Sequence, residues 1–405
     1  MPTTIDPSVS SGISRRSFFR FAAGASALAT VPIITESHLA WAARPTFADP
    51  NKGIHIDANE NPMGPSDAAR QAMIDIVPRG GRYLMPFESE LIEIFAKQEG
   101  LNPDSVMAFP GSSDPLHYTV LAFTGKDRPV VVADPGYEAP MWAAESNGAP
   151  VIKVPLCDPK GAACHDIKGM LAAASNPGVI YICNPNNPTG TCTPRKDLEY
   201  AVAHAPKDTV LLIDEAYIHL CDEPRSLDFV KEGKNVIVLR TFSKLYGMAG
   251  IRMGFAVGRS DLLAKITPLG GMNALPITAV AAAKASLLDA DLVPTRKKII
   301  ADTRAQTLAW LKSEGYSFTP SESNCFMLDV RKPGKEVQAA LAAKEMYVGR
   351  IWPAWPNSVR ITVGTPDEMM AFRKAFTDVM GSSTAGLVPL KMPRRLEETP
   401  FTHLS

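Results

Sequence analysis

The chain has 405 residues, of which 45% are hydrophobic and 21% are charged, a composition typical of a globular protein with a sizeable core. Lysine plus arginine and aspartate plus glutamate number 42 each, so no excess of positive charge favours nucleic acid or an anionic membrane as a partner. Composition and charge therefore indicate a small-molecule ligand and no nucleic acid.

The first 43 residues have the pattern of an export signal. Arg15 and Arg16 precede an apolar, alanine-rich run that ends at Ile34, and residues 40–42 fit a small-residue cleavage site. The apolar run is shorter than the roughly 20 residues that a spanning helix needs, so we expect no stable membrane span. The paired arginines predict a twin-arginine signal peptide over residues 1–43 and a periplasmic or extracellular protein. The alternatives are an amphipathic helix and an unstructured tail.

The six cysteines and seven histidines do not have the spacing of metal ligands, so we expect no metal. The default role of such cysteines is that of small buried hydrophobes. An exported protein could also form a disulfide among them, but the sequence does not determine which cysteines would pair.

Residues 44–80 are predicted to form an N-terminal arm or a segment of a small domain. Residues 54–57 alternate like a short strand and lead into a proline-rich loop, residues 59–65. Ser66 is a candidate N-cap for the helix that follows, and a second helix is expected over residues 88–98, ending at Gly100.

Short β-branched runs then alternate with helical stretches, and polar residues follow the end of each run. The runs cover residues 129–134, 151–154, 179–183, 210–214, 236–239 and 251–257. Buried strands joined by helices predict a mostly parallel sheet with helices on both faces. Ligands of such sheets bind beyond the carboxyl ends of the strands.

Two loops in this region have the composition of a binding site. Residues 111–114, Gly-Ser-Ser-Asp, open an apolar helix and offer N–H groups and hydroxyls to an anion, although a simple helix cap has a similar sequence. Lys244 follows the strand at 236–239 and suits a Schiff base with an aldehyde. Hydroxyls and a guanidinium that suit a phosphate lie near it in sequence: Thr241, Ser243 and Arg252. On its own, the stretch could also be a basic turn between two strands.

The remaining chain is predicted to form a smaller unit. A long helical region from about residue 278 to 314 connects the large domain, residues 81–317, to a small α/β domain over residues 318–380. Residues 381–405 are rich in proline, serine and charge, which is typical of a loosely attached tail.

Six motifs follow one another along the chain: Asn59-Glu-Asn-Pro62, Asn184-Pro-Asn-Asn-Pro-Thr-Gly190, Asp214-Glu-Ala-Tyr217, Thr241-Phe-Ser-Lys244, Gly250-Ile-Arg-Met-Gly254 and Val359-Arg-Ile-Thr-Val-Gly364. Their order and spacing resemble the fold-type I aminotransferases that use pyridoxal 5′-phosphate, and most of all the histidinol-phosphate aminotransferase group. The resemblance covers roughly residues 54–380. It implies an α/β fold whose large domain has a mostly parallel, seven-stranded sheet between helices, with a smaller C-terminal α/β domain.

The resemblance also implies pyridoxal 5′-phosphate as the cofactor and a role for each motif residue. Lys244 would bond to the cofactor aldehyde and then move the proton at the substrate's Cα. Asp214 would keep the ring nitrogen protonated, and Asn187 and Tyr217 would hydrogen-bond the phenolic oxygen. Tyr137 would stack on the ring. The phosphate would be bound by Ser112, Ser113, the backbone N–H of Asp114, Thr241, Ser243 and Arg252.

Each of these residue types also has a plainer role. Asp214 could be an ordinary carboxylate at the end of a strand, Asn187 could cap a turn, Tyr217 could pack in the core, and Tyr137 could be a turn residue after Pro-Gly. The motifs together favour the functional interpretation.

Other residues are implied at the substrate and at a partner. Tyr83 would reach the phosphate bound by a partner subunit, which implies a homodimer with shared active sites. Arg360, Arg350 and Asn61 would bind the substrate, and Arg360 would pair with a carboxylate or a phosphate. An aromatic stretch, residues 351–357, contains Trp352 and Trp355, which either line a pocket for an apolar side chain or pack in the small domain.

The motifs predict an aminotransferase that carries an amino group from an L-amino acid to a 2-oxo acid. One alternative keeps the cofactor but breaks another bond, as in a decarboxylase, a lyase or a cyclising synthase. A second alternative is a binding protein that holds the cofactor without catalysis, and the intact set Lys244, Asp214, Tyr217 and Arg252 argues against it.

Overall fold

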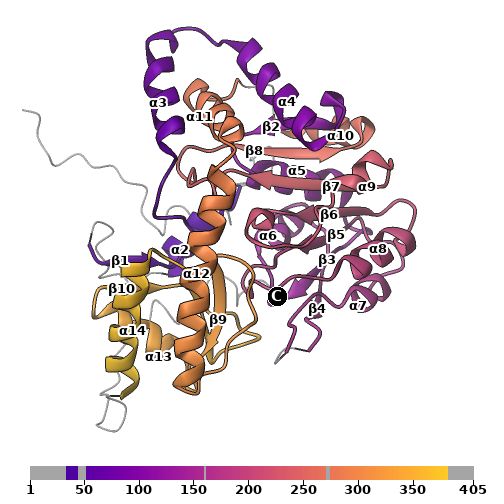
Figure 1. Ribbon diagram of the computed structural model, residues 1–405. Coiled ribbons are helices and arrows are strands. Elements are labelled where there is room, and N and C mark those ends of the chain that lie inside the picture. Colours follow the sequence, from indigo (N-terminus) through magenta and orange to yellow (C-terminus); the bar gives the residue numbers. More distant parts are fainter. Residues whose placement is uncertain (1–32, 44–51, 159–160, 271–273, 382–405) are drawn as a thin grey trace, which may run out of the picture. The chain divides into compact units, whose positions relative to one another are not determined.

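The computed structural model describes residues 33–43, 52–158, 161–270 and 274–381 (Figure 1). The paired arginines of the predicted signal and the tail beyond residue 381 lie outside this range. Within it, no helix has the length and hydrophobicity needed to cross a membrane. One short helix, α2 (Glu36–Ala43), belongs to the predicted signal segment.

A seven-stranded sheet in the order β2-β8-β7-β6-β5-β3-β4 forms the centre of the fold. Its strands are β2 (Val106–Phe109), β3 (Val130–Asp134), β4 (Val151–Pro155), β5 (Val179–Cys183), β6 (Val210–Asp214), β7 (Val236–Thr241) and β8 (Gly254–Gly258). All neighbouring pairs are parallel except those of β8, which is antiparallel to both β2 and β7. The strands β5 to β8 are buried along their whole length, which explains why their sequences do not alternate between apolar and polar residues. The predicted mostly parallel, seven-stranded sheet is confirmed.

Helices pack around this sheet (Figure 1). They are α4 (Met85–Glu99), α5 (Ser113–Phe123), α6 (Ala139–Ser146), α7 (Ile167–Ala172), α8 (Arg195–His204), α9 (Leu227–Lys231) and α10 (Ser260–Gly270). Helix α5 contacts the central strands β5 and β6, whereas α9 contacts β7 and β8. The amino end of α5 thereby faces the part of the sheet that the sequence assigns to the ligand.

Strands from the two ends of the described chain form two small sheets. β1 (Ile54–Ile56) pairs in parallel with β10 (Met346–Val348), and β9 (Cys325–Asp329) pairs antiparallel with β11 (Ser358–Thr362). Helix α13 (Gly334–Ala342) packs against β10 and β11, and it also contacts α14 (Pro366–Gly381). The strand predicted at residues 54–57 therefore joins the C-terminal elements.

The predicted long helical region consists of two helices, α11 (Ile277–Leu288) and α12 (Leu292–Ser313). The Asp289 carboxylate accepts a hydrogen bond from the Asp291 N–H (3.2 Å), an Asp-centred turn that separates the two helices. Helix α11 packs against α3 (Asp67–Ile76) and α4, whereas α12 contacts α14.

Two helix ends match their sequence signals. The Ser66 hydroxyl accepts the Ala69 N–H at the start of α3 (3.2 Å), and Gly100 ends α4 in the left-handed conformation (φ 65°). Helix α4 begins at Met85, three residues before the predicted start, because Pro86 fits the first helical turn.

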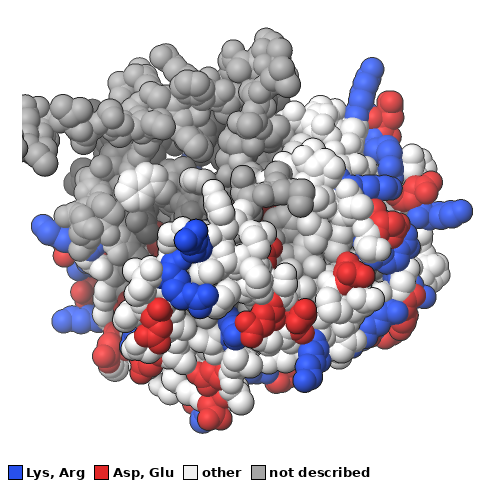
Figure 2. Space-filling view, turned by 90° about the horizontal axis from the view of Figure 1, so that it is seen from above, with Lys and Arg blue, Asp and Glu red and all other residues white. Residues whose placement is uncertain are grey.

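The cysteines and the surface complete the description. Cys157 and Cys164 form a disulfide, with Cα atoms 5.5 Å apart, and Cys183, Cys192, Cys221 and Cys325 are free thiols. Figure 2 shows one face of the molecule, on whose described part basic and acidic side chains are interspersed. This mixture agrees with the equal numbers of the two charges in the sequence.

Candidate active site

A cavity of about 380 Å³ lies where the adjacent strands β5, β6 and β7 end, and the last residue of each strand lines it. The cavity brings together most of the residues that the sequence assigned to a cofactor: Ser112, Ser113, Tyr137, Asn187, Asp214, Tyr217, Thr241, Ser243, Lys244 and Arg252. A volume of this size is typical of small-molecule sites.

Asp214, the last residue of β6, is a buried carboxylate in this cavity. It accepts hydrogen bonds from the Tyr181 hydroxyl (2.8 Å) and from the Ala216 N–H (3.1 Å). Burial raises the pKa of Asp214 to about 6 in spite of these hydrogen bonds. A cation bound beside the carboxylate would oppose this shift, so Asp214 suits a protonated ring nitrogen.

Lys244 lies in the turn after β7, and its side chain is buried. The Lys244 Nζ is 5.5 Å from the centre of the Tyr217 ring. Burial lowers the pKa of Lys244, which increases the fraction of neutral amine. A neutral amine is the form that attacks an aldehyde.

Tyr217 is held in place by a residue from the loop after β1. The Asn59 amide donates to the Tyr217 hydroxyl oxygen (3.0 Å), so the phenolic hydrogen stays available for another acceptor. Burial raises the pKa of Tyr217 well above its ordinary value, and the phenol therefore stays protonated. It can act as a hydrogen-bond donor toward the cavity.

The part of the cavity lined by Ser112, Ser113 and Arg252 has the features of an anion site. Helix α5 begins there, and the Arg252 guanidinium donates to the Ser243 hydroxyl (3.4 Å) and to the Ala249 carbonyl (2.8 Å). Gly111 lies against this guanidinium so closely that an added Cβ would overlap it. Arg252 itself has a left-handed backbone (φ 69°), a conformation that is uncommon for residues other than glycine.

Two arginines of the C-terminal region, Arg360 and Arg350, bind acidic and polar side chains near the cavity. Arg360, in β11, is fully buried and donates to the Asn187 side-chain oxygen (2.9 Å) and to the Asp57 carbonyl (2.5 Å). Arg350 donates to the Glu138 carboxylate (2.7 Å). Both guanidinium groups also form an ion pair with one shared carboxylate, that of Glu36 in α2.

The comparisons with known proteins identify the family. The model for "Aminotransferase class I and II" matches residues 51–376. The chain belongs to this family.

Two relatives of this chain differ in the substrate that their names give. The chain is 32% identical over 331 residues to a histidinol-phosphate aminotransferase of Symbiobacterium thermophilum, a match that covers 81% of this chain and 91% of the relative. It is also 32% identical over 336 residues to an aromatic amino acid aminotransferase of Rhodococcus jostii, covering 82% and 92% of the two chains. The structure is similar to that of histidinol-phosphate aminotransferase from Sinorhizobium meliloti in complex with pyridoxal-5′-phosphate, with a TM-score of 0.73, 27% identity and coverage of 81% and 90%.

The aminotransferase uses pyridoxal 5′-phosphate, and its cavity fits this molecule. A buried amine, a buried carboxylate and an anion cradle lie around one space: Lys244, Asp214 and the turn at Gly111 with Arg252. These are the three kinds of group that an aldehyde, a pyridine nitrogen and a phosphate require.

Five predicted residues do not line this cavity: Arg350, Arg360, Tyr83, Asn61 and Asp114. Tyr83 is 83% exposed on the surface before α4. Asn61 donates to the Leu245 carbonyl (2.8 Å) and accepts the Met63 N–H (3.1 Å), so it supports the loop that carries Lys244. Asp114 lies in the first turn of α5, and burial raises the pKa of its carboxyl group, which Arg252 partly offsets.

Trp352 is buried, and Trp355 is partly buried. Trp352 is 2% exposed, its indole N–H donates to the Gly136 carbonyl (2.9 Å), and its ring lies 4.7 Å from the Arg350 guanidinium carbon. Trp355 packs against a small apolar cluster with Ala133 and Leu156. Of the two hypotheses for these residues, packing is the one that the structure supports.

The sequence motifs do not predict a role for three residues of the site. Tyr181 was a possible candidate, because a lone hydroxyl within the aliphatic strand β5 needs a polar partner when it is buried. Asn59 stands in a recognised motif but received no role. Glu36 gave no signal, since its segment has the composition of an export leader.

Proposed function

We propose that this aminotransferase takes its amino group from an L-amino acid whose α-carboxylate pairs with Arg360 and Arg350, and that the acceptor is a 2-oxo acid. One observation carries the proposal. The two guanidinium groups, both buried, converge on a single carboxylate at the edge of the cavity that contains Lys244. Paired arginines in this arrangement favour a planar anion over a neutral group.

The protein's own groups would divide the chemistry as follows. When bound, pyridoxal 5′-phosphate supplies an aldehyde that bonds to amines and a ring that withdraws electrons from the reacting carbon. Lys244 would take the proton from the substrate's Cα and return it on the cofactor side, a role that its lowered pKa supports. Asp214 would keep the ring nitrogen protonated.

The remaining residues would bind and orient. Tyr217 and Asn187 would hydrogen-bond the phenolic oxygen, and Tyr137 would cover the ring. The phosphate would be bound by the start of α5 and the neighbouring side chains: Ser112, Ser113, Asp114 through its N–H, Thr241, Ser243 and Arg252. Trp352 would position the arginine pair, since its ring lies near both guanidinium groups.

We further propose a donor with a flat ring as its side chain. The support comes from the relatives, whose names refer to histidinol phosphate and to aromatic amino acids. The test is a comparison of kcat/KM for L-phenylalanine, L-aspartate and L-histidinol phosphate with one common 2-oxo acid. We expect L-phenylalanine to exceed L-aspartate by at least about tenfold, a discrimination typical of an apolar pocket. Turnover of histidinol phosphate alone would contradict the carboxylate assignment.

A homodimer in which Tyr83 serves the partner's cofactor is part of the proposal. Large apolar side chains are exposed around Tyr83, as expected of a surface that another subunit covers: Ile74, Val77 and Met85. Tyr83→Phe should weaken cofactor binding by about three- to tenfold, the effect of one hydrogen bond. A purified monomer that transaminates normally would contradict the shared site.

We also propose export by the twin-arginine route to the periplasm or the outside of the cell. Beyond the paired arginines, the disulfide between Cys157 and Cys164 supports an oxidising compartment. Replacement of Arg15 and Arg16 by lysine should leave the protein in the cytoplasmic fraction.

A further inference from the structure

Part of the predicted signal segment lies inside the active-site cavity. The residues just before α2 and in its first turn line the same space as Lys244 and Asp214: Thr35, Glu36, Ser37 and His38. This segment precedes the predicted cleavage site at residues 40–42, so cleavage there would detach it from the enzyme.

Glu36 makes the contacts that the proposed function assigns to a substrate carboxylate. One of its oxygens accepts from Arg360 (2.6 Å), and the other accepts from Arg350 (2.9 Å) and from the Asn187 amide (3.1 Å). Burial alone would raise the pKa of Glu36, but the two guanidinium groups lower it to about 2. Glu36 is therefore an anion at any pH at which the enzyme is expected to work.

The segment is anchored on both sides of Glu36. The Ile34 N–H donates to the His117 ring (3.0 Å), and burial lowers the pKa of His117 to about 4, so this ring is a neutral acceptor at pH 7. The side chains of Ile34 and Leu39 are buried in the main apolar core. These contacts fix the approach of the segment to the arginine pair.

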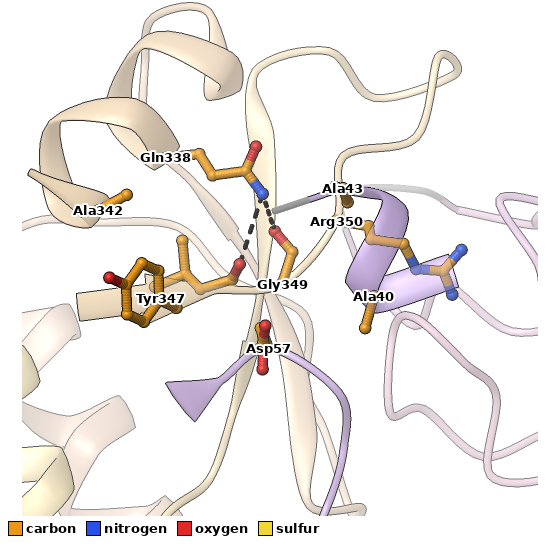
Figure 3. Close-up of a pocket in the computed structure, with 9 residues that line it drawn as sticks. Ala40, Ala43, Asp57, Gln338, Ala342, Tyr347, Gly349 and Arg350 are labelled. Atoms are coloured by element: carbon orange, nitrogen blue, oxygen red, sulfur yellow. Dashed lines mark hydrogen bonds between the residues drawn. The ribbon is translucent and has the colours of Figure 1, made fainter. Parts of the chain in front are cut away.

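Helix α2 also packs closely on the small domain. Figure 3 shows Ala40 and Ala43 of α2 near Arg350. The Gln338 side chain donates to the Val348 and Gly349 carbonyls at the end of β10. The gap that remains between them is about 10 Å³, room for about one water molecule. The helix therefore fits this surface with little space left.

Glu36 already occupies the arginine pair, since each guanidinium group donates a hydrogen bond to its carboxylate. The terminal nitrogens of Arg360 also donate to the Asn187 side chain and to the Asp57 carbonyl. An incoming substrate must displace Glu36, and a tethered group competes at a high effective concentration.

We propose that residues 33–43 act as an intramolecular competitor for the substrate carboxylate, which keeps the full-length chain in a low-affinity state until this segment is cut away. The proposal rests on the proposed function, because it takes the pair Arg350 and Arg360 as the substrate's carboxylate site. An enzyme with this device would have little activity before the leader is removed.

The test uses the full-length chain loaded with pyridoxal phosphate and the unreactive carboxylate 3-phenylpropionate as the probe. Glu36→Ala should lower the Kd of the probe at least tenfold relative to wild type and lower the KM for L-phenylalanine, with kcat unchanged. Ser37→Ala is the matched control, because Ser37 lines the same cavity in the same helical turn but its hydroxyl contacts Thr35 and not the arginine pair, so this variant should behave like wild type. Equal Kd values for wild type and Glu36→Ala would overturn the proposal.

A second measurement does not depend on a substitution in the leader. A protease site inserted after Ala43 allows one folded sample to be compared before and after the cut, and the cut should lower the Kd of the probe at least tenfold. Hydrogen exchange of residues 33–43 in the uncut chain should become faster when the probe saturates the site. Unchanged affinity after complete release of the peptide would overturn the proposal.

Arg360→Ala in the Glu36→Ala background separates this proposal from the proposed function. If Arg360→Ala abolishes binding of the probe but Glu36→Ala does not improve it, only the competitor role fails. If Arg360→Ala leaves binding unchanged, the carboxylate site fails, and the competitor role fails with it.

Discussion

The cofactor side and the carboxylate side of the cavity are assembled in different ways. On the cofactor side, Asp214, Thr241 and Lys244 lie at or just after the ends of neighbouring strands of one sheet. On the carboxylate side, Glu36 and Arg360 meet although 324 positions separate them in the chain. The first arrangement depends on local sequence and a regular sheet, whereas the second exists only after distant segments have packed together.

The largest effect is expected on the cofactor side, from Lys244→Ala. Loss of the amine removes both the covalent attachment of the cofactor and the group that moves the proton, so turnover should fall by at least about 10³-fold. Stopped-flow detection of the 2-oxo acid product measures this loss. A variant with transamination within tenfold of wild type would refute the assignment of Lys244.

Asp214→Asn should separate stability from function. Burial raises the pKa of Asp214 to about 6, whereas an unfolded chain has a value of about 3.9, so the cofactor-free protein should lose stability as the pH rises from about 4 to about 6. The cofactor-free variant should therefore be more stable than wild type at pH 7, by on the order of 2–3 kcal/mol in denaturant unfolding. Well below pH 4, Asp214 is protonated in both the folded and the unfolded protein, and this difference in stability between wild type and variant should vanish.

Cofactor binding should show the opposite dependence on this carboxylate. Wild-type affinity for pyridoxal phosphate should fall as the pH drops through about 6, since protonated Asp214 no longer pairs with a cation. Asp214→Asn should bind weakly at every pH, and its kcat should fall by about 10²-fold. Affinity that is independent of pH in wild type would contradict the role of Asp214.

A smaller and more selective effect is expected on the carboxylate side. Arg360→Lys should raise the KM for the amino acid by about 10–100-fold, because lysine cannot replace a buried, forked donor, while the cofactor's absorbance stays unchanged. Arg350→Lys is the matched comparison, and a milder increase is expected because Glu138 already neutralises part of Arg350's charge. If Arg360→Lys changed kcat and KM by the same factor, the carboxylate side would not act independently of the cofactor side.

This difference between the two sides explains which parts of the fold and of the site the sequence could predict. The central sheet and the cofactor residues were predictable because each β-branched run ends in a polar motif, as at Asp214 and Lys244. The partners of Arg360 were not, because hydrogen bonds between distant segments leave no periodic pattern. Asn61 illustrates the same limit, since its motif does not predict the hydrogen bond from its side chain to the Leu245 carbonyl. Trp352 could equally have lined a pocket, and only the packing of its ring near two guanidinium groups decided its place.

The most direct test of transamination is a spectral titration of the cofactor-loaded protein with L-phenylalanine, with products identified by mass. We expect the absorbance of the bound aldehyde form to give way to that of its amine form. One equivalent of the 2-oxo acid should appear, with every carbon of the substrate retained. Release of carbon dioxide, or of a side-chain fragment, would mean that the enzyme breaks a different bond, and the assignment of transamination would be wrong.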